Sequence, residues 1–191
     1  MGLPYARVWK AGQVGRLNAD DWARAALEAL AEGGLAAVAV EPVAVRLGVS
    51  KGSFYWHFRN RRALVEAALR RWETGTEQVI AELETVREPV ARMRALLGRA
   101  FGDRHDAAVS FRLISEADDP EVREVARRVS ERRLAYMRAT LEEAGRPPDE
   151  AARRVLAGYG TYLGLAALAR VGVAGEAPPE LVEIVMAELG L

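Results

Sequence analysis

Residues 41–58 read EPVAVRLGVSKGSFYWHF, and their spacing decides the fold of the first third of the chain. Ala44 is small, Gly48 follows four positions later, and Phe54 lies six positions beyond the glycine. Two short helices that cross closely need such a pattern, because a small residue lets the second helix approach and glycine can adopt the positive φ of the turn. Four more apolar side chains are expected to fill the seam beneath the helices: Val43, Leu47, Val49 and Phe58. The pattern predicts a helix-turn-helix unit whose second helix can enter a DNA groove.

The start of that second helix carries the short polar and basic side chains that a major-groove reader presents. Ser50 is a natural N-cap, and Gly52 lets the backbone come close to DNA. Lys51 and Ser53 are expected to meet base edges. The free N–H groups at this end of the helix also favour phosphate.

The residues that follow extend the predicted DNA contact. Tyr55 and His57 can donate hydrogen bonds to phosphate oxygens, and Arg61 opens the next helix, where it can bind the same strand. Trp56 has two interpretations that the sequence leaves open: it packs against its own head, or it contacts backbone sugar and phosphate. The chain has two histidines, too few for a metal cluster or a catalytic dyad without other support, so no metal site is expected.

Two phrases carry a resemblance to a known family: WARAALEALAEGGL at 22–35 and VAVRLGVSKGSFYWHFRNRRALVEAAL at 43–69. Together they resemble the N-terminal domain of the TetR family of transcriptional regulators over about residues 17–69. The resemblance implies a three-helix head, a divergent helical body that binds a small effector, and a homodimer formed largely through the last two helices.

One position departs from the family pattern. Members usually carry Ser or Thr at the start of the first helix of the pair, whereas this chain has Ala39 between two valines. Losing that hydroxyl removes a cap worth about 1 kcal/mol and one phosphate contact. No DNA role is expected for Ala39.

Composition indicates a globular chain and excludes several kinds of chemistry. Of the 191 residues, 50% are hydrophobic and 28% are charged, and there is no cysteine, which excludes disulfides, thiolate catalysis and cysteine-based metal sites. The beginning of the chain shows no secretory segment, and the longest uncharged run, 155–169, is too short to span a bilayer comfortably, so the expectations are no membrane and a cytoplasmic protein.

The charges are distributed unevenly although the net charge is zero. Residues 1–72 contain 11 Lys and Arg against 6 Asp and Glu, a net charge of +5, which leaves −5 for the remainder. A basic N-terminal third on an acidic body is typical of a phosphate-binding head joined to a regulatory body, although a chance imbalance of solvated faces would look the same.

The chain is predicted to be all-α, with a flexible basic arm at 1–17, the helix-turn-helix domain at 18–66 and a ligand-binding and dimerisation bundle at 67–191. Apolar residues recur at helical spacing throughout, and no strand-like alternation of useful length appears. Roughly nine helices are expected. Beyond the helix pair and the 18–32 helix before it, they fall at 61–84, 88–101, 106–116, 120–144, 149–171 and 179–189.

Aromatic, sulfur-bearing and two polar residues of the body are candidates for an effector pocket, with Arg112 or His105 placed to bind an acidic group. For any one aromatic residue, ordinary core packing is the more frequent role. The candidate pocket residues are Trp72, Met93, Phe101, His105, Phe111, Arg112, Tyr136, Met137, Tyr159 and Tyr162.

Small residues along 149–171, with apolar residues of 179–189, suggest an isologous four-helix seam between two copies, with ordinary packing inside one chain as the alternative. The candidate interface residues are Gly160, Gly164, Leu168, Leu181, Ile184 and Val185.

These features favour a ligand-responsive TetR-type regulator, most simply a repressor, which binds a palindromic double-stranded DNA operator as a homodimer. A second hypothesis is a helical small-molecule-binding or interaction protein that no longer reads DNA, motivated by Ala39 and the zero net charge. An enzyme ranks third, since no catalytic residues, cofactor motif or metal-ligand spacing appear.

Overall fold

The computed structural model describes residues 17–173, 178 and 180–191, and the regular structure in them is entirely helical. The predicted basic arm, apart from Leu17, lies outside the described residues. Nine α-helices and one 3-10 turn follow in order within this described part, which confirms the predicted all-α fold: α1 (Ala19–Gly33), η1 (Leu35–Ala37), α2 (Val40–Leu47), α3 (Lys51–Phe54), α4 (Arg61–Leu83), α5 (Pro89–Gly102), α6 (Arg104–Ser115), α7 (Pro120–Glu143), α8 (Pro148–Arg170) and α9 (Leu181–Leu189).

Side-chain caps fix where several of these helices begin. The side chain of Asn18 accepts hydrogen bonds from the amides of Asp20 and Asp21 at 2.8 and 3.1 Å, and the Asp21 carboxylate accepts from the Asn18 amide at 3.0 Å. Asn60 caps α4 in the same way, through the Ala63 amide at 2.9 Å. These capping bonds, reciprocal at α1 and single at α4, satisfy backbone donors that have no partner inside the helix, so short local sequences determine the helix starts.

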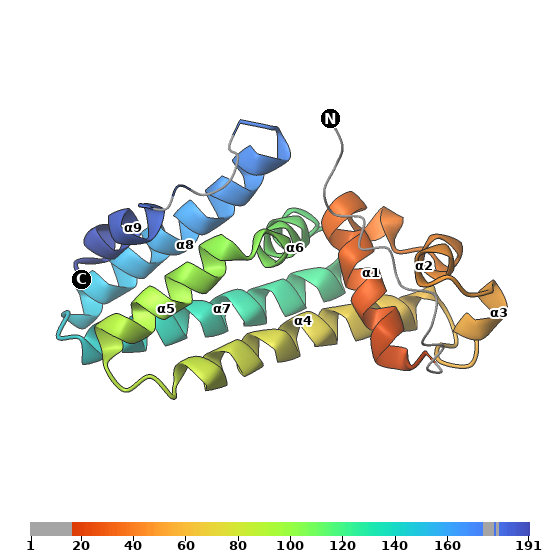
Figure 1. Cartoon of the computed structure of the whole chain (residues 1–191), viewed down its shortest axis with the longest axis horizontal. Helices are drawn as coiled ribbons and strands as arrows, with labels where there is room; N and C mark the ends of the chain where they lie inside the picture. Colours follow the sequence, from red (N-terminus) through yellow and green to blue (C-terminus); the bar gives the residue numbers. More distant parts are fainter. Residues whose placement is uncertain (1–16, 174–177, 179) are drawn as a thin grey trace.

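The head consists of α1, α2 and α3 packed against the first turns of α4 (Figure 1). Val43, Ala44 and Phe54 are buried as the spacing predicted, and the ring of Phe54 meets Trp22 of α1 edge-on at 5.5 Å. Phe58 stacks on the other side of Phe54 at 5.6 Å. The seam between the helices is therefore filled by side chains from within one short segment and from α1.

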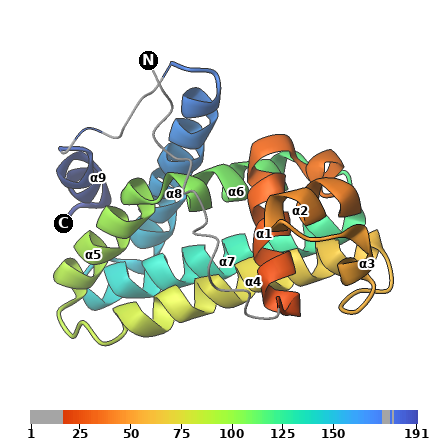
Figure 2. The same ribbon diagram turned by 45° about the vertical axis from the view of Figure 1, so that its right-hand side comes forward.

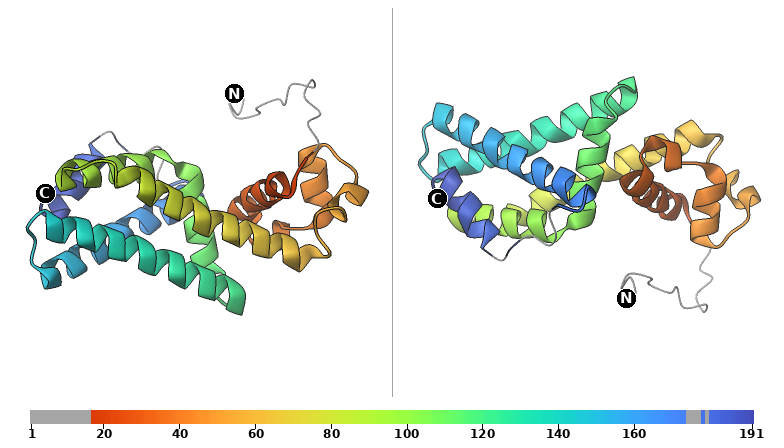
Figure 3. Two further views of the ribbon diagram at one scale, coloured as in Figure 1. Left: turned by 90° about the horizontal axis from the view of Figure 1, so that it is seen from below. Right: turned by 90° about the horizontal axis from the view of Figure 1, so that it is seen from above.

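The body extends away from the head along two long helices, α4 and α7, which lie side by side (Figures 1 and 2). Ion pairs join them, including Arg128 to Glu73 at 2.7 Å and Arg132 to Glu77 at 3.0 Å. Helices α5, α8 and α9 pack around a second apolar cluster, and the C-terminus lies at the end of the body away from the head (Figure 3). None of the helices described is long and apolar enough to cross a membrane.

Two of the predicted interface residues belong to the core of the protomer. Leu181 and Val185 of α9 are 9% and 3% exposed, and they pack with residues such as Leu97 and Met137. The prediction that Leu181 and Val185 contact a second protomer was wrong. The face of α9 that carries them packs against α5 and α8 of its own chain. Ile184, on the other face of α9, is 54% exposed.

Candidate nucleic-acid interface and effector cavity

The turn between α2 and α3 has the geometry that the sequence predicted. Gly48 adopts φ of 69°, in the left-handed region that favours glycine. Its amide donates to the Val45 carbonyl at 3.0 Å, and the Val49 amide donates to the Ala44 carbonyl at 3.0 Å. Ala39 is the N-cap of α2 and makes no side-chain capping bond, as its methyl group requires.

The outer edge of this turn and of α3 is exposed. Lys51, Gly52, Tyr55 and Trp56 face solvent, with Tyr55 60% and Trp56 83% exposed. Trp56 therefore does not pack against its own head, and its contact with backbone sugar and phosphate stays a prediction. Phe54 at 0% exposure anchors the same segment from beneath. The head thus presents aromatic and basic groups on a firmly held backbone.

Ser50 differs from the prediction in one respect. It is the N-cap residue of α3, but its hydroxyl makes no capping hydrogen bond. The helix covers only four residues, and its first turn is held by the Ser53 amide, which donates to the Ser50 carbonyl at 3.0 Å. Ser50 is itself exposed, so its hydroxyl is available to an outside partner.

Carboxylates accompany several basic residues of the head. Lys51 pairs with Glu41, and this hydrogen bond raises the pKa of the Lys51 ammonium while lowering that of Glu41. Arg46 pairs with Glu32 and, at 3.6 Å, with Glu28. Arg59 is exposed and, within the described part of the chain, has no ion pair. No sequence pattern marked Arg59 as a DNA-binding residue, because it stands in a link between helices.

Arg61 has a structural role in addition to its predicted DNA contact. Its guanidinium donates to the carbonyl oxygens of Leu35 and Val38 in the segment between α1 and α2. These bonds hold the start of α4 against the start of α2. Its predicted phosphate contact stays a prediction, and the bonds to Leu35 and Val38 already account for two of its donors.

A cavity of about 890 Å³, partly open to solvent, lies beside the head, between α1 and helices α4 to α8. Six of the predicted pocket residues line it: Trp72, Phe101, Tyr136, Met137, Tyr159 and Tyr162. The remaining four do not. Met93 is 0% exposed in the apolar core, and His105 is exposed at the first turn of α6, outside the cavity.

Phe111 and Arg112 line a second cavity of about 730 Å³, between α1, α5, α6 and α8. Arg112 donates from its guanidinium to the Glu32 carbonyl at 3.0 Å. Arg112 therefore lies at the second cavity, outside the main one, with its guanidinium bound to the end of α1, and its predicted contact with an acidic effector stays a prediction. Phe101 and Tyr162 line both cavities.

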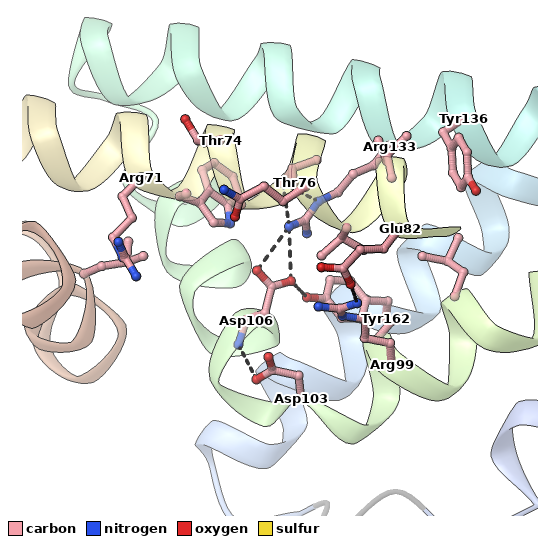
Figure 4. A pocket seen from close by; sticks show the side chains of 18 of the residues that line it. Arg71, Thr74, Thr76, Glu82, Arg99, Asp103, Asp106, Arg133, Tyr136 and Tyr162 are labelled. Carbon is pink, nitrogen blue, oxygen red and sulfur yellow. Dashed lines mark hydrogen bonds and ion pairs between the residues drawn. The ribbon is translucent and has the colours of Figure 1, made fainter. Parts of the chain in front are cut away.

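A polar cluster at one wall of the main cavity escaped the sequence analysis (Figure 4). Arg133 of α7 pairs with Asp106 of α6 at 3.1 Å, and its guanidinium also donates to Ser110 at 2.9 Å and Thr76 at 3.0 Å. The Tyr162 hydroxyl of α8 donates to Asp106 at 2.7 Å. The cluster joins four helices. A periodicity signal existed, because Arg133 shares the spacing of buried Val129, Tyr136 and Met137 on α7.

The charges of this cluster stabilise one another. Burial alone would lower the pKa of Arg133, but the neighbouring Asp106 carboxylate raises it above the ordinary arginine value. Burial, reinforced by the charge of Asp106, raises the pKa of Tyr162, so the phenol stays protonated and remains a donor. Arg133 also lies over the Trp72 ring at 5.4 Å. The ion pair thus forms a fixed part of the cavity wall.

Two helices connect the cavity to the head. Helix α4 contributes Trp72 and Thr76 to the cavity wall and buries Leu64 and Val65 in the head core. Helix α6 carries Asp106 in the cavity at one end, while at its other end Glu116, just past its last residue, accepts from the Leu35 amide at 3.2 Å.

One face of α8 is apolar and uncovered in the protomer. Leu156, Gly160, Gly164 and Leu168 repeat at intervals of four residues, so they lie on one side of the helix, and all four are exposed. A Cβ added at Gly160 or Gly164 would meet nothing within 4 Å. Exposed Ile184 of α9 adds a further apolar side chain.

Proteins built in this way, with an exposed helix-turn-helix on a helical body that encloses a cavity, form the class of helix-turn-helix transcriptional regulators. The sequence comparisons narrow this class. The family model for bacterial regulatory proteins of the tetR family matches residues 23–68. The class A tetracycline repressor from transposon 1721 of Escherichia coli is 44% identical over 52 residues, and the class D repressor of Escherichia coli is 40% identical over the same length. Each match covers 27% of this chain and 24% of the relative, so the chain matches about a quarter of the length of these repressors.

Solved structures resemble almost the whole chain. A transcriptional regulator from Rhodococcus sp. Rha1 is 26% identical with a TM-score of 0.73, over 91% of this chain and 95% of that one. A regulator from Saccharomonospora viridis in complex with choline is 20% identical with a TM-score of 0.71, over 90% and 93% of the two chains. The fatty acid degradation regulator FadR from Bacillus halodurans is 17% identical with a TM-score of 0.70, over 90% and 93%. The last two resemblances concern the fold alone. Residues 23–68 therefore match the DNA-binding domain of the tetR family of bacterial regulatory proteins, and the chain shares its fold with transcriptional regulators over about nine tenths of its length.

Proposed function

We propose that this regulator is a repressor that binds a palindromic operator as a homodimer, through Ser50, Lys51, Gly52, Ser53, Tyr55, Trp56 and His57, and that it acts in the cytoplasm. The observation that carries the proposal is the exposed edge of α3, where Lys51, Tyr55 and Trp56 face solvent above the buried anchor Phe54. Large aromatic side chains that are exposed in the free protein are typical of a binding surface, where a partner shields them from water. A duplex offers such a partner, since phosphate, sugar and base edges suit both kinds of side chain.

A homodimer is proposed because one four-residue recognition helix holds DNA weakly. Two copies about 34 Å apart would read two half-sites one helical turn apart. The exposed face of α8, with Ile184 of α9, supports a seam between two protomers, because glycines at its centre let two backbones approach closely.

We propose that a small molecule in the main cavity releases the operator. Helix α4 lines the cavity and carries the head, so a ligand that prefers one tilt of α4 would change the separation of the two recognition helices. Helix α6 offers a second connection, through Asp106 in the cavity and the Glu116 contact to the Leu35 amide. A relative of the same fold that was solved with choline supports the idea of a small effector, without indicating which one.

Operator binding tests the role of the head directly. Duplexes from the DNA upstream of the coding sequence would be titrated with the protein and followed by fluorescence anisotropy at several salt concentrations. We expect Lys51→Ala and Tyr55→Ala each to weaken the operator complex at least about tenfold, because each removes a base or phosphate contact. Lys51→Ala also leaves Glu41 without its partner, next to the phosphates.

The matched control is Arg138→Ala, which removes an exposed positive charge from α7 in the body. This variant should bind the duplex as the unmodified protein does. Unchanged binding by both head variants would count against the assigned interface.

One observation favours the second candidate function, a helical binding protein whose head does not read DNA. Lys51 and Arg46 are both neutralised by carboxylates of the head. The two functions differ in their response to salt: phosphate contacts release counterions and make DNA affinity fall steeply with salt concentration. A regulator gives that steep dependence, whereas a binding protein of the second kind gives no operator complex at any salt concentration.

A further inference from the structure

Two hydrogen-bond donors on the wall of the main cavity have no partner. The indole N–H of Trp72 and the hydroxyl of Tyr136 are buried, with side chains 3% and 7% exposed, and neither makes a hydrogen bond to any described residue. Burial raises the pKa of Tyr136, so its hydroxyl keeps its proton and remains a donor. Both residues line the cavity.

These two donors stand apart from the other unpartnered atoms. The remaining buried polar atoms without a hydrogen bond in the described part of the chain belong to residues that do not line this cavity: Trp22, Arg92, Arg112, Glu121 and Arg146. Buried donors normally find an acceptor, since a missing hydrogen bond leaves them desolvated and unpaired. A ligand in the cavity is the available source of acceptors for Trp72 and Tyr136.

The charged side chains of the cavity wall are already in use. Arg133 pairs with Asp106, Arg99 with Glu82, Arg71 with Asp20, and Arg70 with Glu66. The one other charged lining residue, Asp103, accepts from the amides of His105 and Asp106 at the start of α6. In the interior of the cavity, a charged ligand would have to displace Arg133 or Asp106 from their pair or remain buried without a counter-charge, and both are unfavourable. The other three pairs are largely exposed, where such interactions are weak.

The two donors lie some distance apart along the cavity. Trp72 lies over the Arg133 guanidinium, whereas Tyr136 packs in a cluster with Ile80, eight residues after Trp72 on α4. At 1.5 Å per helical residue, the backbone positions of Trp72 and Ile80 are about 12 Å apart along α4, so the two donors contact α4 at different points along its length. The wall between them includes apolar side chains, among them Ile80, Leu96 and Leu97. Figure 4 shows Tyr136 at one side of the view and the Arg133–Asp106 pair nearer its centre.

We infer that the effector is an uncharged, elongated molecule with an apolar middle and a hydrogen-bond acceptor near each end, bound by Trp72 and Tyr136. The inference rests on one part of the proposed function, namely that the effector binds in the main cavity. It names the chemical class of the ligand: neutral esters, ketones, lactones or similar oxygen-bearing apolar compounds. Carboxylates and ammonium compounds of the same length bind more weakly, because Arg133 and Asp106 already balance each other's charge in the interior of the cavity.

A matched set of probes tests this class by isothermal titration calorimetry on the full chain. Dimethyl decanedioate carries an ester at each end of an apolar chain, methyl decanoate carries one, and decanoate and decyltrimethylammonium carry opposite charges. We expect the diester to bind most tightly, the monoester more weakly, and the two ions least.

Two substitutions test the donors. Tyr136→Phe keeps the ring and removes the hydroxyl, and Trp72→Phe removes the indole N–H. Each substitution should weaken diester binding about fivefold, which is the effect of one lost neutral hydrogen bond. Each should also narrow the difference in affinity between the diester and the monoester. A purely structural role would weaken both esters equally. Trp22→Phe is the control, because it removes an unpartnered indole N–H from the head core, outside this cavity, and should leave ester affinity unchanged.

The outcomes separate this inference from the proposed function when operator binding is measured on the same samples. An ionic probe that binds as tightly as the diester, full diester affinity in both variants, or no binding by any probe overturns the inference, even if the operator complex is intact. Probe binding in the expected order without an operator complex leaves the inference standing and rejects the proposed function.

Discussion

At the scale of single residues, Gly34 shows how closely the head and body fit. It adopts φ of 73°, and a Cβ at this position would lie 1.9 Å from Oε1 of Glu116. The same Oε1 accepts from the Leu35 amide at 3.2 Å. A residue with a side chain would therefore suffer both backbone strain and a clash with the carboxylate that connects the end of α6 to the head.

We predict that Gly34→Ala lowers the free energy of unfolding by about 1 kcal/mol or more, because alanine is strained at positive φ and Glu116 must move. Urea denaturation followed by circular dichroism measures this change. Gly98→Ala is the matched control, since Gly98 is exposed within α5 with nothing within 4 Å of an added Cβ. The control should be slightly more stable than the unmodified chain. Equal stability of the two variants would contradict this account of Gly34.

Residues of the head were predictable from sequence, while the polar wall of the cavity was not. Ala44, Gly48 and Phe54 interact within one short segment, so their spacing contains the geometry. Asp106 and Arg133 are 27 residues apart on different helices, and each looks like an ordinary surface charge in its own helix. Their pairing depends on how α6 and α7 pack, which local patterns do not specify.

At the scale of elements, the start of α7 is a junction between head and body. Asp119 caps α7 by accepting from the amides of Glu121 and Val122 at 3.0 and 3.2 Å, and it also accepts from Arg62 of α4 at 3.1 Å. Partial burial alone would raise the pKa of Asp119, but these hydrogen bonds outweigh it and lower the pKa below the ordinary value of 3.8. The ionised form of Asp119 is therefore the one that favours folding.

A pH dependence follows from the direction of this shift. A carboxyl whose folded pKa is depressed stabilises the fold fully above its unfolded pKa, and the contribution disappears as pH falls through the lower folded pKa. We predict that Asp119→Asn lowers the melting temperature near neutral pH and reduces the loss of stability below about pH 4. Thermal melts across the acid range measure both effects.

Asp118→Asn is the control for that experiment. It removes a carboxylate from the exposed neighbouring position, and Asp118 is not the capping residue of α7. The control should keep the acid response of the unmodified chain. The same acid response in both variants would show that the cap does not contribute as stated.

Outside the head, the starts of the helices were the feature that the sequence predicted best. Caps and prolines mark the starts of α4, α5 and α7 within a residue or two of the predicted positions. The start of α6 was set two residues too late, because Asp103 was taken as part of a loop when it is the capping residue.

At the scale of the whole molecule, the exposed face of α8 predicts the oligomeric state. Leu156 and Ile184 are 63% and 54% exposed, an unfavourable position for such side chains unless a second protomer covers them. We predict that the double variant Leu156→Glu, Ile184→Glu is monomeric, since two protomers would bury like charges against each other. Light scattering coupled to size-exclusion chromatography gives the mass.

Ala81→Glu, on an exposed position of α4, is the control and should keep the mass of the unmodified protein. The double variant should also lose most of its operator affinity, because a monomer contacts only one half-site of the operator. A dimer of unchanged mass would place the seam elsewhere.

The largest apolar cluster includes Trp22 and Phe54 of the head together with Val109 of α6 and Val129 of α7. It therefore crosses the predicted boundary at residue 66, and the head has no separate core of its own. Engineers who exchange the DNA-reading portions of regulators to build biosensors would have to transplant the inner faces of α6 and the first half of α7 along with residues 18–66. A chimera cut at residue 66 would separate the buried head residues of that cluster from their partners on α4, α6 and α7.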